Sequence, residues 1–474
     1  MDLTQLQPSE VWKFFSELCQ IPRPSGHEER VAKYIVDFAR NKGFQVSRDT
    51  VGNVFVHKTG RKPVIALQAH MDMVCEKNKD VEHDFMHDPI KPLTDGKFVT
   101  ADGTTLGADD GIGVAMILAA LDMSDRELEC LFTVQEETSL AGANASQPGL
   151  FTAGELINLD TGCEKEVIIG CAGTSTLRLV FDARLSDIPD GMFAVRIKIG
   201  GLAGGHSGED INKNRANAVK LLAVFLDVLQ NSMPYCLCDI NGGGLSNAIA
   251  REAEAVVAVP FEKKEEVRIL WNVYVSQIED EWKKYEEGLK TSLESCPLPK
   301  QCFDGNVKQN LTAFLTACPH GVIEQDKSVQ GIVDGSANLA SVRTECGKVV
   351  VINSQRHFDF AKMQMIASEI SNLAEKYGAC TESAGAYPGW QPDFDNPLVT
   401  KVVAAYESEL GFRPTVMPIH AGLECACFAK LYPRMKAVSI GPDMWGIHSP
   451  DEKLSVESVG RIWRVLQRIL SWEE

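Results

Sequence analysis

Short apolar runs separated by a helical segment constrain the fold of the first third of the chain most strongly. The run KPVIALQAHMDMV (62–74) has the dense apolar character of a strand that is buried on both faces of a sheet. LECLFTV (128–134) and ELINLD (155–160) are further strand candidates, and the segment GIGVAMILAALDMS (111–124) is a predicted helix. This alternation predicts a layered α/β domain.

A different pattern begins near residue 177. LRLVFDARLSD (177–187) alternates apolar and polar residues as half-exposed antiparallel strands do, and a long charged helix is predicted over 265–290. The α/β pattern returns in the last hundred residues, with a strand predicted at 435–441. We therefore predict an α/β domain with a mixed sheet, formed by residues 1–176 and 379–474, and an inserted α+β domain at 177–378.

One helix start is predicted in detail. In PSGHEERVAKYIVDFARNKG, Ser25 is expected to be the N-cap residue and Glu28, three residues later, to complete a capping box. Gly43 is the expected stop.

The formal net charge of −18 argues against nucleic acid as a partner. Most of this excess is expected on a solvated acidic surface, although it also suits a site where carboxylates hold cations. The start MDLTQLQPSEVWKFF lacks the pattern of a secretory signal, and no window approaches 18 uninterrupted apolar residues. We therefore expect a cytoplasmic protein without a membrane span, in which the 14 scattered cysteines are reduced thiols.

Polar residues follow the predicted buried strands at their carboxyl ends, where ligand sites in open α/β sheets lie. His70 and Asp72 are two apart on one strand, which suits a metal-bound imidazole oriented by a neighbouring carboxylate. A surface histidine beside a turn is the alternative for this pair.

Two further strands end in carboxylates. Glu136 and Glu137 follow LFTV, so one could bind a metal while the other stays free as a general base. Asp160 ends LINLD, and His448 lies in the loop PDMWGIHSPDE. Each of these is weak evidence alone, because polar strand exits and solvated loop histidines are common.

The stretch LGADDGIG places Asp109 and Asp110 side by side before a helix. A carboxylate that bridges two cations has both of its oxygens used, and the helix N-terminus favours its charge. With two histidines and several carboxylates elsewhere, the set provides nitrogen and oxygen ligands that suit Zn²⁺, Co²⁺ or Mn²⁺ at a two-ion centre.

The order H-x-D, G-A-D-D-G, E-E, N-L-D and G-x-H-S-P-D-E resembles the zinc-dependent exopeptidase superfamily of aminoacylases, carboxypeptidases and dipeptidases. It is most similar to the aminoacyl-histidine (Xaa-His, beta-alanyl-histidine) dipeptidases of bacteria. The likeness extends over nearly the whole chain and includes QAHMDMV, GGHSG, GAYPGWQP and IHAGLEC.

The resemblance implies that residues 1–176 and 379–474 form the catalytic domain of a metallopeptidase and that the inserted domain at 177–378 is a lid and dimerisation domain. It also implies a role for each of these positions. Glu136 would be the general base, and Asp72 would orient a metal-bound histidine. Asp109 would bridge two ions, zinc being the expected metal and cobalt or manganese the alternatives. The remaining metal ligands would be His70, Glu137, Asp160 and His448.

Four substrate contacts are also implied. His206 of GGHSG would stabilise the developing oxyanion, and Asn247 and Arg356 would hold the polar end groups of the substrate. Arginine suits a carboxylate because its planar fork can bind both oxygens. Gly422 of HAGLE would contact the substrate through its backbone. The sequence departs from close relatives at Asp110, where asparagine is frequent, and we expect Asp110 to support a ligand or to cap the helix.

The implied activity is metal-dependent hydrolysis of dipeptides, of the Xaa-His type, by a homodimer. A tripeptidase, a broad dipeptidase and an N-acyl amino acid hydrolase remain alternatives with the same chemistry. A catalytically silent metal-binding protein is disfavoured because the candidate base and every candidate ligand are present. A nucleophilic hydrolase is disfavoured because the sequence has no G-x-S-x-G motif.

Overall fold

The computed structural model describes residues 2–325 and 331–472, which form two compact units. Among the described residues, unit 1 comprises 2–171, 389–418 and 422–472, and unit 2 comprises 172–325, 331–388 and 419–421. The sequence places the change at residues 177 and 378, whereas the contacts place it at 172 and 388. Strand β19 (Cys380–Tyr387) accounts for the later boundary, because it pairs with β9 (Gly173–Asp182) inside unit 2.

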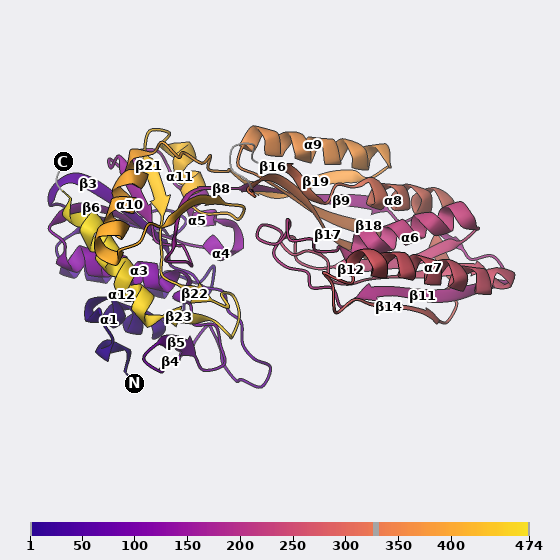
Figure 1. The fold of residues 1–474 in the computed structure, drawn as a ribbon, viewed down its shortest axis with the longest axis horizontal. Helices are drawn as coiled ribbons and strands as arrows, with labels where there is room; N and C mark the ends of the chain where they lie inside the picture. Colours follow the sequence, from indigo (N-terminus) through magenta and orange to yellow (C-terminus); the bar gives the residue numbers. More distant parts are fainter. Residues whose placement is uncertain (1, 326–330, 473–474) are drawn as a thin grey trace. The chain divides into compact units, whose positions relative to one another are not determined.

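Unit 1 is built on a mixed eight-stranded sheet (Figure 1). In spatial order its strands are β1 (Gln45–Arg48), β2 (Val54–Lys58), β6 (Arg126–Thr133), β3 (Arg61–His70), β7 (Glu155–Asn158), β21 (Lys436–Ser439), β8 (Glu166–Cys171) and β20 (Thr415–Ile419). The central strands β6, β3, β7 and β21 are parallel, and β2 and β8 pair antiparallel to their neighbours. The predicted α/β class with a mixed sheet is confirmed.

Helices bury the sheet of unit 1, and its central strands are buried along most of their length. All residues of β6 are buried, and the last six of β3 are buried. Helix α3 (Ala108–Met123) is apolar around its whole circumference and packs on β3 and β6. The other helices are α1 (Ser9–Cys19), α2 (Glu29–Asn41), α4 (Glu136–Ser139), α5 (Ala141–Ala145), α10 (Pro397–Leu410), α11 (Cys425–Leu431) and α12 (Val456–Ser471).

A small antiparallel sheet completes unit 1. Its strands, in spatial order, are β22 (Met444–Trp445), β23 (Lys453–Ser455), β5 (Phe98–Ala101) and β4 (Pro92–Thr94). His448 lies in the connection between β22 and β23. The sheet therefore anchors both ends of the loop that presents this histidine.

Unit 2 has a nine-stranded sheet of its own, with antiparallel pairing (Figure 1). In order the strands are β14 (Lys290–Ser295), β11 (Met192–Gly200), β13 (Ala253–Pro260), β12 (Cys236–Gly243), β17 (Val333–Glu345), β18 (Lys348–His357), β9 and β19, and β16 (Gly321–Gln325) pairs with β17. The helices packed on it are α6 (Ala218–Ser232), α7 (Lys264–Trp282), α8 (Gly305–Ala317) and α9 (Phe360–Lys376), while β10 (Leu185–Asp187) and β15 (Gln301–Phe303) form a separate pair.

Two local predictions are wrong. The N-cap of α2 is Glu28, not Ser25, and the Ser25 hydroxyl donates instead to Oδ2 of Asp72 at 2.7 Å. The long charged helix predicted over 265–290 is α7, which ends earlier, at Trp282. In the first case a distant carboxylate competes successfully for a hydroxyl that local spacing assigned to the helix.

Candidate active site

The parallel strands of unit 1 deliver their carboxyl ends to one edge of the sheet. His70 is the last residue of β3, Glu136 and Glu137 form the first turn of α4 after β6, and Asp160 follows β7 by two residues. Residues on either side of α4, Gln135 and Leu140, have left-handed backbone with φ of 53° and 52°. This sharp conformation at non-glycine residues turns the chain so that both glutamates stay at the strand ends.

Asp109 lies between the two predicted histidine ligands. Its Oδ1 is 3.1 Å from Nε2 of His70, and its Oδ2 is 3.3 Å from Nε2 of His448. Glu137 contacts the same nitrogen of His448 at 2.9 Å, and Asp160 lies 3.7 Å from His70. Each carboxylate oxygen of Asp109 therefore faces a different half of one cluster.

The side chains present fit divalent metal ions. Three groups each place their ligand atoms within 4.8 Å of one another: His70 with Asp109 and Asp160, Asp109 with Glu137 and His448, and His70 with Glu136 and Glu137. In addition, Oε1 of Glu137 is buried and has no hydrogen-bond partner within residues 2–325 and 331–472. Nitrogen and carboxylate ligands in sets of three are the donors that zinc prefers at catalytic sites.

The pKa values of these groups reflect crowded negative charge. Burial raises the pKa of the Glu136 and Asp160 carboxyls well above their ordinary values, and Asp109 adds to both shifts. Burial opposes the charged form of His448, but hydrogen bonds to Asp109 and Glu137 raise its pKa to about 11. Bound protons on these groups thus offset the crowded negative charge of the cluster, as bound metal cations would do.

Asp72 connects the histidine ligand to the two glutamates. Its Oδ1 lies 3.4 Å from Nδ1 of His70, which leaves Nε2 of the imidazole directed at Asp109. The same carboxylate accepts hydrogen bonds from the backbone N–H groups of Glu136 at 3.0 Å and Glu137 at 3.3 Å. Although β3 ends at His70, Asp72 therefore orients the imidazole and also fixes the first turn of α4.

Two buried charged residues hold the loop that carries Asp109. Glu452 accepts hydrogen bonds from the backbone N–H groups of Leu106, Gly107 and Ala108 at 2.7, 3.0 and 2.8 Å. Arg23 donates to the carbonyl oxygens of Met71, Asp72 and Gly107, and so ties the end of β3 to the same loop. A Cβ at Gly107 would approach the Arg23 guanidinium to 2.6 Å, which explains the glycine there.

Asp110 has a different environment from its neighbour. Asp109 and Asp110 both have non-helical backbone, and the peptide bond between them is cis. Oδ1 of Asp110 accepts the N–H of Gly113 at 3.1 Å, which is the bond an N-cap residue makes three positions into a helix. The capping alternative predicted for Asp110 thus matches the contact that it makes.

The predicted substrate-binding residues of the lid come together within unit 2. Nη2 of Arg356 lies 3.4 Å from Nε2 of His206, and Nε of Arg356 donates to the hydroxyl of Ser207 at 3.4 Å. Asn247 is exposed, and its carbonyl oxygen accepts the N–H of Ser207 at 2.7 Å. Nη1 of the buried Arg356 has no hydrogen-bond partner among the residues described, which suits an anionic ligand.

His420 belongs to the same basic group, and sequence reasoning gave it no role. Its Nε2 contacts the hydroxyl of Ser336 at 2.7 Å. Burial lowers the pKa of its imidazole to about 3, and the charge of Arg356 adds to the shift. Its place in IHAGLEC beside Gly422 was the available signal.

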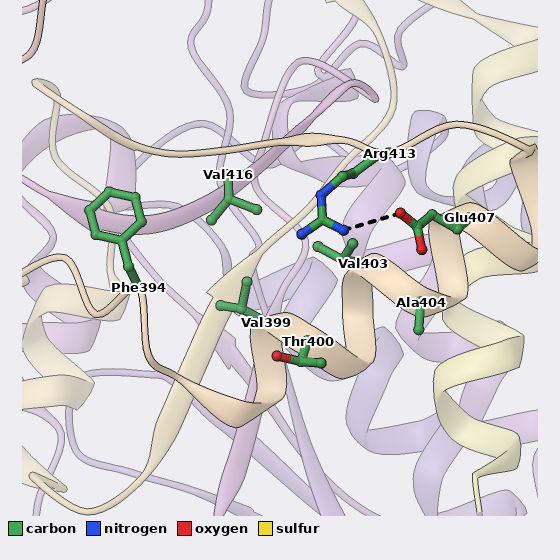
Figure 2. A pocket seen from close by; sticks show the side chains of 8 residues that line it. All are labelled: Phe394, Val399, Thr400, Val403, Ala404, Glu407, Arg413 and Val416. Atoms are coloured by element: carbon green, nitrogen blue, oxygen red, sulfur yellow. Dashed lines mark hydrogen bonds and ion pairs between the residues drawn. The ribbon is translucent and has the colours of Figure 1, made fainter. Parts of the chain in front are cut away.

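A separate groove of about 320 Å³ lies along α10 in unit 1 (Figure 2). Phe394, Val399 and Val403 supply apolar walls, and Arg413 pairs with Glu407 at 3.2 Å. No predicted catalytic or metal-binding residue lines this groove. The chemistry belongs to the polar cluster at the strand ends instead.

The fold and the cluster together are those of a hydrolase that could use metal ions. Residues 66–472 match the model of "Peptidase family M20/M25/M40". The chain is 41% identical over 482 residues to the cytosol non-specific dipeptidase of Escherichia coli, covering 99% of this chain and 98% of that protein. The chain therefore belongs to peptidase family M20/M25/M40.

Solved structures agree with this assignment. The aminoacylhistidine dipeptidase of Vibrio alginolyticus superposes with a TM-score of 0.87 at 40% identity, covering 99% of this chain and 98% of that one. Human carnosine dipeptidase 1 gives a TM-score of 0.52 at 12% identity, over 99% and 97% of the two chains, and is similar in fold alone. Within the described residues, no helix has the length and apolar character needed to cross a membrane.

Proposed function

We propose that the chain is a dipeptidase that uses two divalent metal ions, with zinc as the ion and cobalt or manganese as substitutes. The observation that carries this proposal is the position of Asp109, whose two oxygens face His70 and His448 separately. The names of the relatives in E. coli and V. alginolyticus, both dipeptidases, support the substrate class.

His70, Asp109 and Asp160 would hold one ion, and Asp109, Glu137 and His448 the other. When bound, the ions acidify a water molecule and polarise the peptide carbonyl. Glu136 takes the proton of the attacking water and passes it to the leaving amine. Burial raises the pKa of Glu136, which favours this proton uptake.

Four further residues are proposed to contact the substrate. His206 stabilises the oxyanion by donating a hydrogen bond, and Arg356 binds the terminal carboxylate through Nη1, which has no partner among the described residues. Asn247 and the backbone of Gly422 complete the substrate contacts. In a dipeptide a free terminal carboxylate lies next to the peptide bond, whereas an interior bond of a longer peptide has none nearby. A carboxylate-binding Arg356 therefore favours exopeptidase activity.

We further propose a cytosolic homodimer with Xaa-His substrates of the beta-alanyl-histidine type. Exposed apolar side chains support a contact surface on unit 2: Ile269 and Val273 lie one turn apart on α7 and are 62% and 54% exposed. Sedimentation at several protein concentrations tests the dimer, and a monomer at every concentration would contradict it.

The substrate proposal is tested on purified full-length protein with added Zn²⁺, Co²⁺ or Mn²⁺. A panel compares Xaa-His dipeptides, other dipeptides, tripeptides and N-acyl amino acids at equal concentration. We expect the highest kcat/KM for dipeptides and loss of turnover after treatment with a chelator. Preference for tripeptides or N-acyl amino acids would support the alternative hydrolases, and turnover that survives the chelator would exclude the metal mechanism.

A further inference from the structure

A row of buried polar side chains crosses the central sheet of unit 1, just before the strand ends that carry predicted metal ligands. Gln68 pairs in register with Asn158, and Asn158 pairs with Ser439 on the next strand. Gln68 precedes His70 by two residues, and Asn158 precedes Asp160 by two. The members of the row have no exposed surface: Gln68, Thr133, Asn158, Glu424 and Ser439.

The hydrogen bonds of the row all run in one direction. Ser439 donates its hydroxyl to Oδ1 of Asn158, and Nδ2 of Asn158 donates to Oε1 of Gln68 at 2.7 Å. Nε2 of Gln68 then donates to Oε2 of Glu424. Because each acceptor is paired with the next donor, the orientation of both amides is fixed by the carboxyl group at the end.

Glu424 closes the row. Its Oε2 also accepts the hydroxyl of Thr133 at 2.6 Å, while Thr133 accepts a second N–H of Gln68 at 3.2 Å. These three side chains therefore form a closed triangle between β3, β6 and the residue that precedes α11. Oε1 of Glu424 has no hydrogen-bond partner in the part of the chain that the structure describes.

The row also contacts the site. Oδ1 of Asn158 accepts the N–H of Asp160 at 3.3 Å, and Thr133 pairs in register with His70. The charge of Glu424 contributes to the raised pKa of Glu136, so the two carboxyls lie within electrostatic range. The mechanism described above assigns no task to Glu424 or to the row.

Apolar packing cannot by itself fix the register of these strands. A slip by two residues keeps every side chain on its original face, so the buried apolar pattern tolerates it. Such a slip would separate Gln68 from Asn158 and leave several buried polar groups without partners. The row therefore selects the register that places His70 beside Asp160.

We propose that Glu424 is a positioning residue of the metal centre, which acts by anchoring the polar row that holds His70 and Asp160 in place. This inference rests on the proposed metal site. The other ion would be held by Asp109, Glu137 and His448, and the hydrogen bonds of the row described above do not involve Glu137 or His448. Loss of Glu424 should therefore weaken the binding of the ion at His70 and Asp160 far more than the binding of the other ion.

The test measures two zinc dissociation constants on full-length protein, by competition with a chromophoric chelator after the metal has been removed. In Glu424→Gln, an NH₂ group replaces one of the two carboxylate oxygens. At the position of Oε2 it would face two donors, the N–H of Gln68 and the hydroxyl of Thr133. At the position of Oε1 it would have no acceptor among the described residues. We expect the ion at His70 and Asp160 to bind about 10–100-fold more weakly, which is the usual effect of losing a group that supports a metal ligand. The other ion should keep its affinity. The Co²⁺ absorption spectrum should change for the weakened site alone.

Three further variants make the result decisive. Ser439→Ala removes one donor at the far end of the row, and should weaken the same ion by a smaller factor even if Glu424→Gln fails to fold. The exchange variant Gln68→Glu with Glu424→Gln restores a donor and an acceptor across the triangle, and should recover affinity. Glu129→Gln is the matched control, because Glu129 is a buried carboxylate on the same strand β6 that binds the N–H groups of Thr152 and Ala153.

Equal losses at both ions, a similar loss in Glu129→Gln, or unchanged binding in Glu424→Gln and Ser439→Ala would overturn the positioning role. If the natural chain binds fewer than two ions, the proposed metal centre fails first. Two ions in the natural chain together with unchanged variants contradict the row alone.

Discussion

The two histidine clusters of the molecule have opposite electrostatic environments. In unit 1, carboxylates surround the histidines, and hydrogen bonds to Asp109 and Glu137 raise the pKa of His448 to about 11 against the effect of burial. In unit 2, burial and the neighbouring Arg356 lower the pKa of His420 to about 3. The carboxylates thus stabilise positive charge at the histidine in unit 1, where a bound cation would displace the proton, whereas the surroundings in unit 2 keep the histidine neutral.

This contrast indicates what each cluster binds. The unit 1 cluster contains more carboxyl groups than can be ionised together without added positive charge, so it suits bound cations. The unit 2 cluster has an arginine with a buried unpartnered N–H group, which suits a carboxylate.

The largest expected effect comes from removing the carboxylate between the histidines of unit 1. Asp109→Ala should lose both metal ions and essentially all turnover, because Asp109 faces both halves of the cluster. Metal content by mass spectrometry and kcat measure this. The adjacent Asp110→Asn variant is the control and should retain both ions, since asparagine also caps helices well. Retention of two ions by Asp109→Ala would refute the bridging position.

The next effect separates chemistry from metal binding in the same cluster. Glu136→Gln should lower kcat by about 10²–10⁴-fold, the usual contribution of a general base, with metal content unchanged. Near-normal kcat in the variant would exclude Glu136 as the base, and a parallel loss of metal would make it a ligand instead.

A smaller effect is expected from the basic cluster. Arg356→Lys keeps the charge but loses the planar fork, so KM for dipeptides should rise about 10-fold, equivalent to about 1.4 kcal/mol. C-terminally amidated dipeptides, which lack the carboxylate, serve as the control and should show little change in KM. An equal rise for both substrates would mean that Arg356 does not bind the terminal carboxylate.

The smallest effect concerns stability in acid. The folded-state pKa of His420 is about 3, below its ordinary value of 6.5, so between these values the unfolded chain binds a proton that the folded chain does not. The stability that neutral His420 provides is therefore complete above pH 6.5 and is lost as the pH falls toward 3. His420→Gln should show a shallower fall of Tm with acid than the natural chain, and parallel curves would contradict the shifted pKa.

Strand ends and their polar residues could be predicted from the sequence because both are local features. A buried strand is visible as an apolar run, and His70, Glu136 and Asp160 stand at or just beyond the ends of three such runs. The parallel order of β6, β3 and β7 then brings these ends to one edge of the sheet. The structure brings the side chains together, and their individual roles remain predictions.

Residues that act across long sequence distances could not be found in this way. Glu424 contacts Thr133 from 291 positions away, and Glu452 binds the N–H of Leu106 from 346 positions away. Neither carboxylate stands at the end of an apolar strand. Ser25 shows the opposite case. Its local sequence is that of a capping box, but its hydroxyl hydrogen-bonds to Asp72 instead of capping the helix.

The unequal exposure of the two histidines has a kinetic consequence. His70 has no exposed side-chain surface, whereas that of His448 is 52% exposed and its loop has left-handed backbone at φ 64°. An ion held by His448 should therefore exchange with solvent faster than one held by His70. Stepwise loading should then yield a hybrid protein, with the first metal trapped on the buried side and a second, different metal on the open side. Identical exchange rates for the two ions, followed with a metal isotope, would contradict this order.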